Sequence, residues 1–510
     1  MANAAATGSA RASVIVRATD AGTARAAVEA AGGKVTQDLW IVNGVAAEVP
    51  VAALEALRAQ GFDVGTDEPV HLQANPSPLH SATAVYPKVV GADNLWNEGI
   101  DGTGVTVAVM DTGVKPVADL AGRVIGGVDF SSEGDPYDDG FGHGTFVAGL
   151  IAGNGASSNG AYKGVAPNAK IVSIKIAGRN GASDVSHVLA GIQWAVSFKD
   201  DYGIRVINLS LGTDSTQNYW LSPLNAAVER AWDAGIVVTV SASNRGPDPG
   251  TITKPGDDPF VITVAAMDDK GSPGRGDDVM AGYSGQGPTA ANGLVKPDLV
   301  ASGRSVIGLR VPGSKIDTAY PSSRIGTAYF KGSGTSFSTA VASGSVALLL
   351  QREPGLTPNQ VKARLLDNAA AGPVGNPNVD GRGSLDAYAA AHAGTFDSAN
   401  QNAVRSAGDG SIDLDRGSLN LQIQTGSILN PILNLLIPIF QILNSDITAQ
   451  NLAFDPVAYI TSEWSGASWY GASWYGASWY GASWYGASWY GASWYGASWY
   501  GASWYATAWE

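Results

Sequence analysis

The stretch that decides the fold is Val107–Gly113, VAVMDTG, an apolar run that ends at an aspartate and turns at a glycine. Such a run is typical of a buried strand, and parallel sheets place reacting groups where their strands end. Around it, strand and helix candidates alternate over residues 88–392, which predicts an α/β fold with a mostly parallel sheet. The expected strands are Val105–Met110, Ile171–Ile176, Val206–Leu209, Val237–Val240 and Val261–Ala265, and the expected helices include Val185–Phe198, Leu224–Ala234 and Ser338–Gln351.

Composition narrows the class of protein. The 510 residues carry 31 Lys and Arg against 45 Asp and Glu, a formal net charge of −14. This length exceeds that of a typical single domain. The excess of acidic residues argues against nucleic acid as a partner, because phosphate binding requires clustered Lys and Arg. No cysteine is present, which excludes disulfides and thiol nucleophiles, and imidazole chemistry must use one of five histidines.

The regions before and after the α/β pattern have different sequence patterns. Residues 12–73 follow the order β-α-β-β-α-β, which predicts a small ferredoxin-like domain closed by a strand over Phe62–Leu72. A Pro/Ser-rich link around Asn75–Pro78 follows. Residues 393–462 lose the helical period and are expected to form strands and loops. The chain then repeats GASWY eight times from Gly466 to Tyr505.

Two further motifs complete a catalytic pattern with Asp111. The second motif is GHGTFVAGLIAG, Gly142–Gly153, in which His143 is expected at the start of a helix. The third is GSGTSFSTAVASG, Gly332–Gly344, in which Ser336 is expected at the start of another helix. A serine hydroxyl needs a base to become a nucleophile, and the base needs a carboxylate to hold its tautomer. Each motif alone fits a turn or a helix cap, but the ordered set predicts a serine hydrolase with no metal or cofactor in the reaction.

With these motifs the chain resembles the subtilisin-like serine peptidases, or subtilases, over about residues 85–392. The segments KGVAPNAKIVSIKI, VINLSLG, VITVAA, VKPDLVASG and GRGSLDAYAA look like family landmarks in family order. The resemblance implies a three-layer, mostly parallel sheet flanked by helices and a peptidase domain over 85–395, with 396–462 as a linking segment and 463–510 as the repeat tail. It also implies the activity of a serine endopeptidase acting on proteins or peptides.

The resemblance implies further site residues. Asn244 matches the asparagine that stabilises the oxyanion together with the backbone N–H of Ser336. A substrate would bind as an added strand between two edges and beside a side-chain pocket. The implied substrate-binding residues are Gly181, Ala182 and Ser183 on one edge, Ser210, Leu211 and Gly212 on the other, and Ala242 and Ser243 at the pocket.

Several positions depart from the family pattern. Ser183 and Ser243 stand where glycine is usual, so the subsites are expected to be tighter. The other departures are Phe146 in place of a second histidine, Phe337 in place of a methionine, Ala340 in place of a proline, and Ser302 in place of a proline. None of them removes a triad member.

The leading region, residues 1–84, resembles the inhibitory prosegment of subtilases, with a cut expected between Leu79 and Val85 and the tail lying in the cleft as a product. An unrelated binding domain is the alternative. The family also implies structural calcium. Asp135, Asp138 and Asp139 offer oxygen ligands but equally form a solvated acidic loop, so no metal ligand is assigned.

The expected location is extracellular, with surface attachment as an option, although no secretory signal is recognisable in Met1–Ser13. The apolar run Ile428–Leu443 is interrupted by asparagines and prolines and is not expected to span a membrane. The aromatic repeats favour stacking on cell-wall or polysaccharide surfaces, with self-association as the alternative. Two other functions stay open: an inactive adhesin that keeps the fold, and a peptide ligase, for which the usual cysteine nucleophile is absent.

Overall fold

The structure, a computed structural model, describes residues 11–67, 69–72, 84–394, 399–400, 402–415 and 417. The chain divides into two compact units. The leading unit ends at Thr66 and also includes Asp129–Asp135, and the main unit begins at Asp67. The repeat tail, the run Ile428–Leu443 and the remainder of the expected strand-and-loop region lie outside the described residues.

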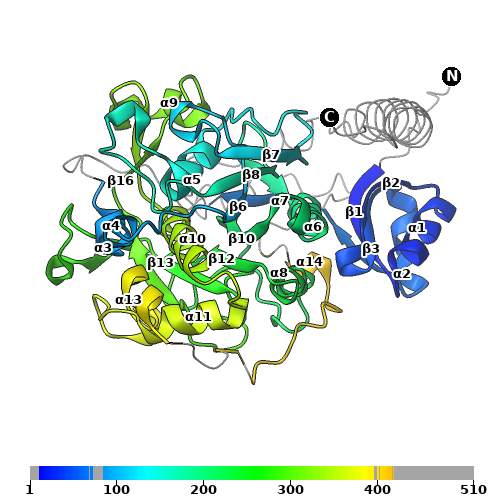
Figure 1. Ribbon diagram of the computed structural model, residues 1–510. Coiled ribbons are helices and arrows are strands. Elements are labelled where there is room, and N and C mark those ends of the chain that lie inside the picture. Colours follow the sequence, from blue (N-terminus) through cyan, green and yellow to red (C-terminus); the bar gives the residue numbers. More distant parts are fainter. Residues whose placement is uncertain are drawn as a thin grey trace, which may run out of the picture. The chain divides into compact units, whose positions relative to one another are not determined.

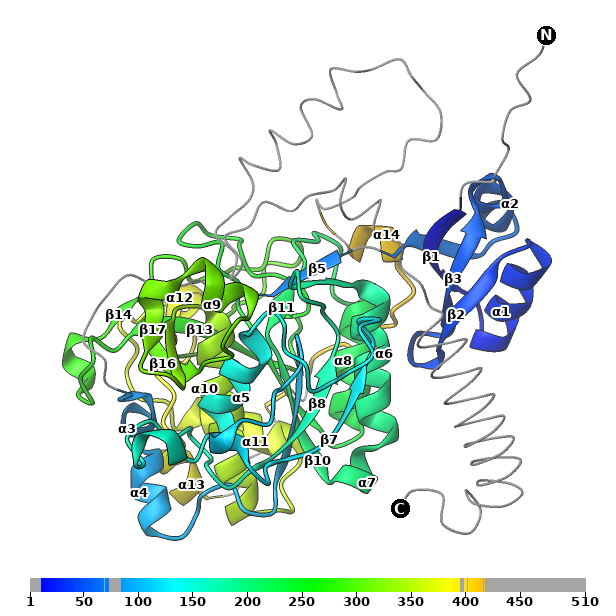
Figure 2. The same cartoon turned by 90° about the horizontal axis from the view of Figure 1, so that it is seen from above.

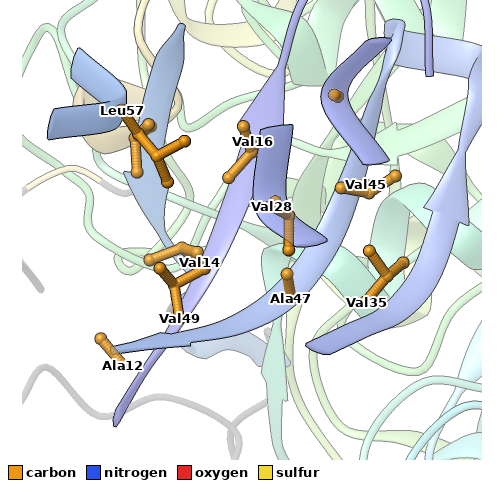
Figure 3. Packing of buried hydrophobic residues seen from close by; sticks show 11 residues of the cluster. Ala12, Val14, Val16, Val28, Val35, Val45, Ala47, Val49 and Leu57 are labelled. Carbon is orange, nitrogen blue, oxygen red and sulfur yellow. The ribbon is translucent and has the colours of Figure 1, made fainter. Parts of the chain in front are cut away.

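The leading unit is a four-stranded antiparallel sheet with two helices. Its order is β1 (Arg11–Arg17), α1 (Ala21–Ala30), β2 (Lys34–Leu39), β3 (Gly44–Pro50), α2 (Leu54–Ala59) and β4 (Asp63–Thr66), and the strands lie in the order β2-β3-β1-β4. Alternate residues of β1 and β3 pack with α1 and α2 in one small aliphatic core, because successive strand residues point to opposite faces (Figure 3). This is the element order expected from the sequence.

The strand expected over Phe62–Leu72 is in fact two strands. The leading sheet ends with β4 at Thr66, and Pro69–Leu72 forms a separate strand, β5, in the main unit. The chain leaves the first sheet at Asp67, whose buried carboxylate accepts a hydrogen bond from the backbone N–H of Ser186, 2.8 Å away. The break therefore falls between Asp67, which has this long-range partner, and Pro69, which has no backbone N–H to donate within a sheet.

The main unit is built on a mostly parallel sheet, as expected. Its strand order is β14-β13-β12-β10-β6-β8-β7, with β15 pairing to β13 (Figure 1). The catalytic candidate Asp111 ends the central strand β6, which is buried along its whole length between β8 and β10. The strands are β6 (Thr106–Asp111), β7 (Val124–Asp129), β8 (Lys170–Lys175), β10 (Ile204–Leu209), β12 (Val237–Ser241), β13 (Ile262–Asp268), β14 (Val279–Met280) and β15 (Leu299–Ser302).

Helices cover the sheet on both faces (Figure 2). Helices α5 (His143–Ala152) and α10 (Thr335–Arg352) pack against each other, as do α6 (Val185–Ser197) and α8 (Pro223–Asp233). Both α5 and α10 are almost wholly buried, which fits their small and aliphatic residues. The other α-helices described in the main unit are α3 (Tyr86–Val89), α4 (Ala92–Asn97), α7 (Lys199–Tyr202), α9 (Lys315–Ala319), α11 (Pro358–Asp367), α12 (Pro377–Asp380), α13 (Ala387–His392) and α14 (Ile412–Asp415).

Two small sheets complete the main unit: β16 (Val306–Leu309), β18 (Tyr329–Gly332) and β17 (Arg324–Ile325) form one, and β11 (Leu211–Gly212), β5 and β9 (Ala182–Asp184) form the other. The described part of residues 399–417 packs along the loop before α8. There Asp415 accepts hydrogen bonds from Gln217, Ser222 and the backbone N–H of Leu224. No helix among the described residues is long and apolar enough to cross a membrane.

Candidate active site

Asp111 and His143 are in direct contact although they are far apart in the sequence. Nδ1 of His143 lies 2.7 Å and 2.8 Å from the two carboxylate oxygens of Asp111, and both side chains are fully buried. A carboxylate at this nitrogen keeps the proton on Nδ1 and leaves Nε2 to act as the base. Nε2 is also buried and makes no hydrogen bond to another described residue.

The close approach of α5 to β6 depends on Gly144. A Cβ atom at this position would lie 2.2 Å from the carbonyl oxygen of Gly113 and 3.0 Å from Cβ of Asp111. Any side chain there would therefore push the start of α5 away from the end of β6. The glycine that follows His143 in the GHG motif thus permits the Asp111–His143 contact.

Thr112 and Asp139 hold this pair in place. The Thr112 hydroxyl donates to Asp139 at 2.7 Å and accepts from the backbone N–H of Gly144 at 3.0 Å. Asp139 also accepts from the N–H groups of Gly142 and Thr145, at 2.6 Å and 2.8 Å. Burial raises the pKa of Asp139, and these donors oppose that shift. Asp139 therefore ties the turn that carries His143 to the residue after Asp111.

Ser336 lies in the first turn of α10, beside the substrate edge expected from the sequence. Its hydroxyl is 3.4 Å from the carbonyl oxygen of Ser210, and the Ser210 hydroxyl is 3.3 Å from the carbonyl oxygen of Ser336. The backbone N–H of Ser336 is among the first donors of an 18-residue helix. Such donors are unused by the helix and favour negative charge.

Asn244 is oriented with its amide N–H group available. Its side-chain oxygen accepts from both the backbone N–H and the hydroxyl of Thr335, each at 2.9 Å. Because the oxygen is fixed by two donors, the other end of the amide must be Nδ2. Nδ2 is buried and has no hydrogen-bond partner among the described residues. An oxyanion hole requires hydrogen-bond donors without partners close to the nucleophile. Nδ2 of Asn244 is such a donor, because Asn244 contacts Thr335, the residue before Ser336.

The two aromatic departures from the family pattern contact each other. The rings of Phe146 and Phe337 are 4.3 Å apart, and the Phe337 ring is 5.6 Å from the imidazole of His143. Glycines make room for them, since a Cβ at Gly308 would lie 2.7 Å from Phe146 and one at Gly332 would lie 2.8 Å from Phe337. The pair forms an apolar wall beside the imidazole.

The residues expected to form the two substrate edges lie in or beside two short strands. Ala182 and Ser183 belong to β9 and follow Gly181, while Leu211 and Gly212 form β11 directly after Ser210. At the expected pocket, Ala242 is buried and Ser243 has a φ of 106°. A positive φ favours glycine, which explains why glycine is the usual residue of the family pattern at this position. In this chain the Ser243 hydroxyl donates to the Thr251 carbonyl.

The space between these two edges is occupied by the chain's own strand β5. It pairs antiparallel with β11 on one side (Figure 2) and with β9 on the other. His71 is opposite both Gly212 and Ala182, and Leu72 is opposite Leu211. The main unit thus contains an added strand of the kind by which such edges bind a peptide.

Two residues of the acidic loop considered for calcium, Asp138 and Asp139, have protein partners. Asp138 is ion-paired with Arg179, and the oxygens of Asp139 are used by Thr112, Gly142 and Thr145. Among the described ranges, no three acidic or histidine side chains are grouped so that they could hold a metal ion. The contacts of Asp139 hold the turn that carries His143.

Comparisons with known proteins identify the family. The profile of the Subtilase family matches residues 102–406. This chain belongs to the subtilase family. The serine protease AprX of Bacillus subtilis (strain 168) is 40% identical over 354 residues, covering 68% of this chain and 78% of AprX. Subtilisin E of the same organism is 32% identical over 368 residues, covering 71% of this chain and 84% of that protein.

A solved structure gives the same result. Fervidolysin from Fervidobacterium pennivorans, a keratinolytic enzyme related to subtilisin, superposes with a TM-score of 0.60 at 25% identity, covering 77% of this chain and 63% of fervidolysin. As a subtilase, the chain is a serine-type endopeptidase that acts on proteins or peptides. Subtilases need no cofactor for catalysis, structural calcium is typical of them, and the comparisons give no support to an adhesin of this fold.

Sequence reasoning missed three supporting features of this subtilase. Thr112 is in the DTG motif and Asp139 lies four residues before His143, so their proximity to the motifs was a usable signal. The contact of Asp67 with Ser186 spans the junction of two elements and has no local signature. Asp415 lies in a segment without periodicity, which gave no indication of its buried contacts.

Proposed function

We propose that this subtilase hydrolyses peptide bonds through Asp111, His143 and Ser336, with Asn244 and the Ser336 N–H as oxyanion donors. The observation that carries the proposal is the buried His143, whose Nδ1 contacts Asp111 and whose Nε2 has no partner in the part of the chain that the structure describes. In the reaction, Nε2 takes the proton of the Ser336 hydroxyl as its oxygen adds to the scissile carbonyl. The same proton passes to the leaving amine, and water then releases the acyl group.

The oxyanion would be stabilised by donors that are already in position. Nδ2 of Asn244 cannot rotate without breaking both hydrogen bonds to Thr335, so it does not have to be reorganised as charge develops. The apolar rings of Phe146 and Phe337 exclude water from one side of the imidazole. Water exclusion strengthens the interaction between the imidazolium and Asp111.

The second part of the proposal is that the enzyme is made as a self-inhibited, self-processing precursor and acts outside the cell. Strand β5 lies between the two substrate edges, where a peptide substrate would have to bind. Residues 1–84 would then act as a prosegment whose tail competes with substrate. Secretion is proposed from the secreted homologues, and attachment through the repeat tail is a further proposal that concerns residues outside the described part.

The test compares purified full-length protein with Ser336→Ala and a matched control, Ser338→Ala. Ser338 is also a buried serine of α10, and its hydroxyl donates to the Thr335 carbonyl. We expect Ser336→Ala to lose turnover of an unfolded protein substrate and to remain uncut, while Ser338→Ala keeps both activities. Turnover by a pure Ser336→Ala sample would contradict the proposed nucleophile.

A further inference from the structure

The 402–417 segment, of which the structure describes residues 402–415 and 417, lies along helix α8 (Figure 1). Near its start, the backbone N–H of Ser406 donates to both carboxylate oxygens of Glu229, at 3.0 Å and 2.9 Å. Near its end, Asp415 in α14 accepts a hydrogen bond from the backbone N–H of Leu224, in the first turn of α8. The segment is therefore attached to α8 at two separate places.

Two glycines let the segment lie in direct contact with the loop before α8. A Cβ atom at Gly410 would lie 2.7 Å from the carbonyl oxygen of Leu221, and one at Gly417 would lie 2.7 Å from the backbone nitrogen of Ser215. Side chains at these positions would force the two backbones apart, so glycine is needed for the close approach. The loop over residues 213–222 is thus packed against this segment.

The segment also holds the residue that follows a substrate edge. Thr213 comes directly after Gly212, the last residue of β11. Its buried hydroxyl donates to the backbone carbonyl oxygen of Asp415 at 2.6 Å. The backbone of Thr213 exchanges two hydrogen bonds with Lys254, at 3.0 Å and 2.8 Å. The end of β11 is therefore held through its backbone by Lys254 and through a side chain by Asp415.

Asp415 is a firm anchor for Thr213 because its own side chain is held by three donors. Its carboxylate accepts hydrogen bonds from Gln217 at 2.6 Å, from the Ser222 hydroxyl at 2.8 Å and from the Leu224 N–H at 3.0 Å. The side chain is fully buried. A carbonyl on a residue held in this way does not follow a moving partner, so its bond to Thr213 restrains the end of β11.

We infer that Asp415 is a positioning residue for substrate binding, which acts through the Thr213 hydroxyl on the edge strand β11. The inference rests on the proposed function. An edge strand binds a peptide through main-chain hydrogen bonds, which are present both before and during the reaction. Loss of such binding raises KM and leaves kcat unchanged. The 402–417 segment thus sets the affinity for extended peptides and takes no part in the chemical step.

The length of the substrate separates this role from a general effect on folding. Ser210 lies next to the nucleophile, since its carbonyl oxygen is 3.4 Å from the Ser336 hydroxyl. Gly212 is two residues further, about 7 Å along an extended strand. A substrate with a single amino acid before the cut does not reach Gly212, whereas a tetrapeptide does. Only the longer substrate should respond to the position of β11.

The experiment compares a tetrapeptide amide with an N-acetyl amino-acid ester, using active enzyme whose sites are counted with a serine-directed phosphonate. Thr213→Val keeps the shape of the side chain and removes the hydroxyl. We expect the tetrapeptide-to-ester ratio of kcat/KM to fall by about 3- to 10-fold through the tetrapeptide KM, the range that one hydrogen bond gives. Thr213→Ser keeps the hydroxyl and should restore the ratio.

Two further variants test the segment itself. Gly410→Val should lower the same ratio, because its side chain would push the segment away from Leu221. The matched control is Leu414→Ala, next to Asp415, where the side chain is 59% exposed. This control should keep the ratio of the unchanged enzyme.

The other outcomes overturn separate claims. An unchanged ratio in both Thr213→Val and Gly410→Val, or an equal fall in Leu414→Ala, overturns the positioning role. A fall in kcat at constant KM does the same, because it places the effect on the chemical step. An unchanged chain that hydrolyses the ester and no peptide, or turnover by a pure Ser336→Ala sample, overturns the proposed function instead.

Discussion

Replacing Thr112 by valine tests how the His143 turn is held. Valine keeps the shape of threonine but removes the hydroxyl that donates to Asp139 at 2.7 Å and accepts from the Gly144 N–H at 3.0 Å. A buried N–H without a partner costs about 1–3 kcal/mol, and a hydrogen bond to a charged group contributes about 1.5–3 kcal/mol. The two effects together lower the expected free energy of unfolding by about 2.5–6 kcal/mol.

The same change should lower kcat more than it changes KM. Thr112 contacts the turn that orients His143 and no substrate edge, so the loss should fall on the chemical step. We expect a decrease of about 10-fold in kcat, equivalent to about 1.4 kcal/mol. Denaturant unfolding is best measured in the Ser336→Ala background to prevent self-digestion. Thr112→Ser keeps the hydroxyl and should restore both quantities. Unchanged stability and kcat in Thr112→Val would refute the role given to this network.

Three further predictions concern other parts of the molecule. Asn244→Ala should lower kcat by about 10²–10³ with little change in KM, a magnitude carried over from a subtilisin oxyanion donor and not worked out from this structure; an effect on KM alone would assign Asn244 to substrate binding. Burial, with repulsion from Asp184 next, raises the pKa of Asp67 to about 7, so docking of β5 favours the protonated carboxyl. Inhibition in trans by separately produced residues 1–73 should therefore weaken between about pH 4 and 7 by up to about 10-fold per pH unit and then level off, and Asp67→Asn should flatten this slope; an unchanged slope in Asp67→Asn would contradict the assignment. Asp415→Ala should lower the free energy of unfolding by about 2–4 kcal/mol in urea, because three buried donors lose their acceptor; a change below about 0.5 kcal/mol would show that the segment after residue 399 contributes little.

Five strands of the main sheet, β6, β8, β10, β12 and β13, could be predicted because buried parallel strands appear in the sequence as short apolar runs bounded by turn residues, whereas β7, β14 and β15 were not among the expected strands. The strand expected at Val105–Met110 is β6 (Thr106–Asp111), and the helix expected at Val185–Phe198 is α6 (Val185–Ser197). The ends of these elements, where chemistry takes place, were also close to their expected positions. The motifs predicted that Asp111, at the end of a parallel strand, acts together with His143, and the two side chains are in contact.

What could not be predicted depends on contacts between distant parts of the chain. Nothing local in Phe62–Leu72 shows that Asp67 meets Ser186, and that contact lies at the break between β4 and β5. For the acidic loop at Asp138 and Asp139 the sequence left oxygen ligands and a solvated loop as alternatives, because composition cannot show that Arg179, Thr112, Gly142 and Thr145 use those oxygens. The buried position of Asp415 likewise depends on its tertiary partners.

The most direct test of the catalytic assignment is to label the active, processed enzyme with a serine-directed phosphonate and map the adduct by mass spectrometry. The proposed mechanism predicts one adduct per molecule on the peptide containing Ser336, and loss of labelling when His143 is replaced by alanine in folded protein. An active enzyme that carries its adduct on another serine, or that labels equally well without His143, would contradict the mechanism.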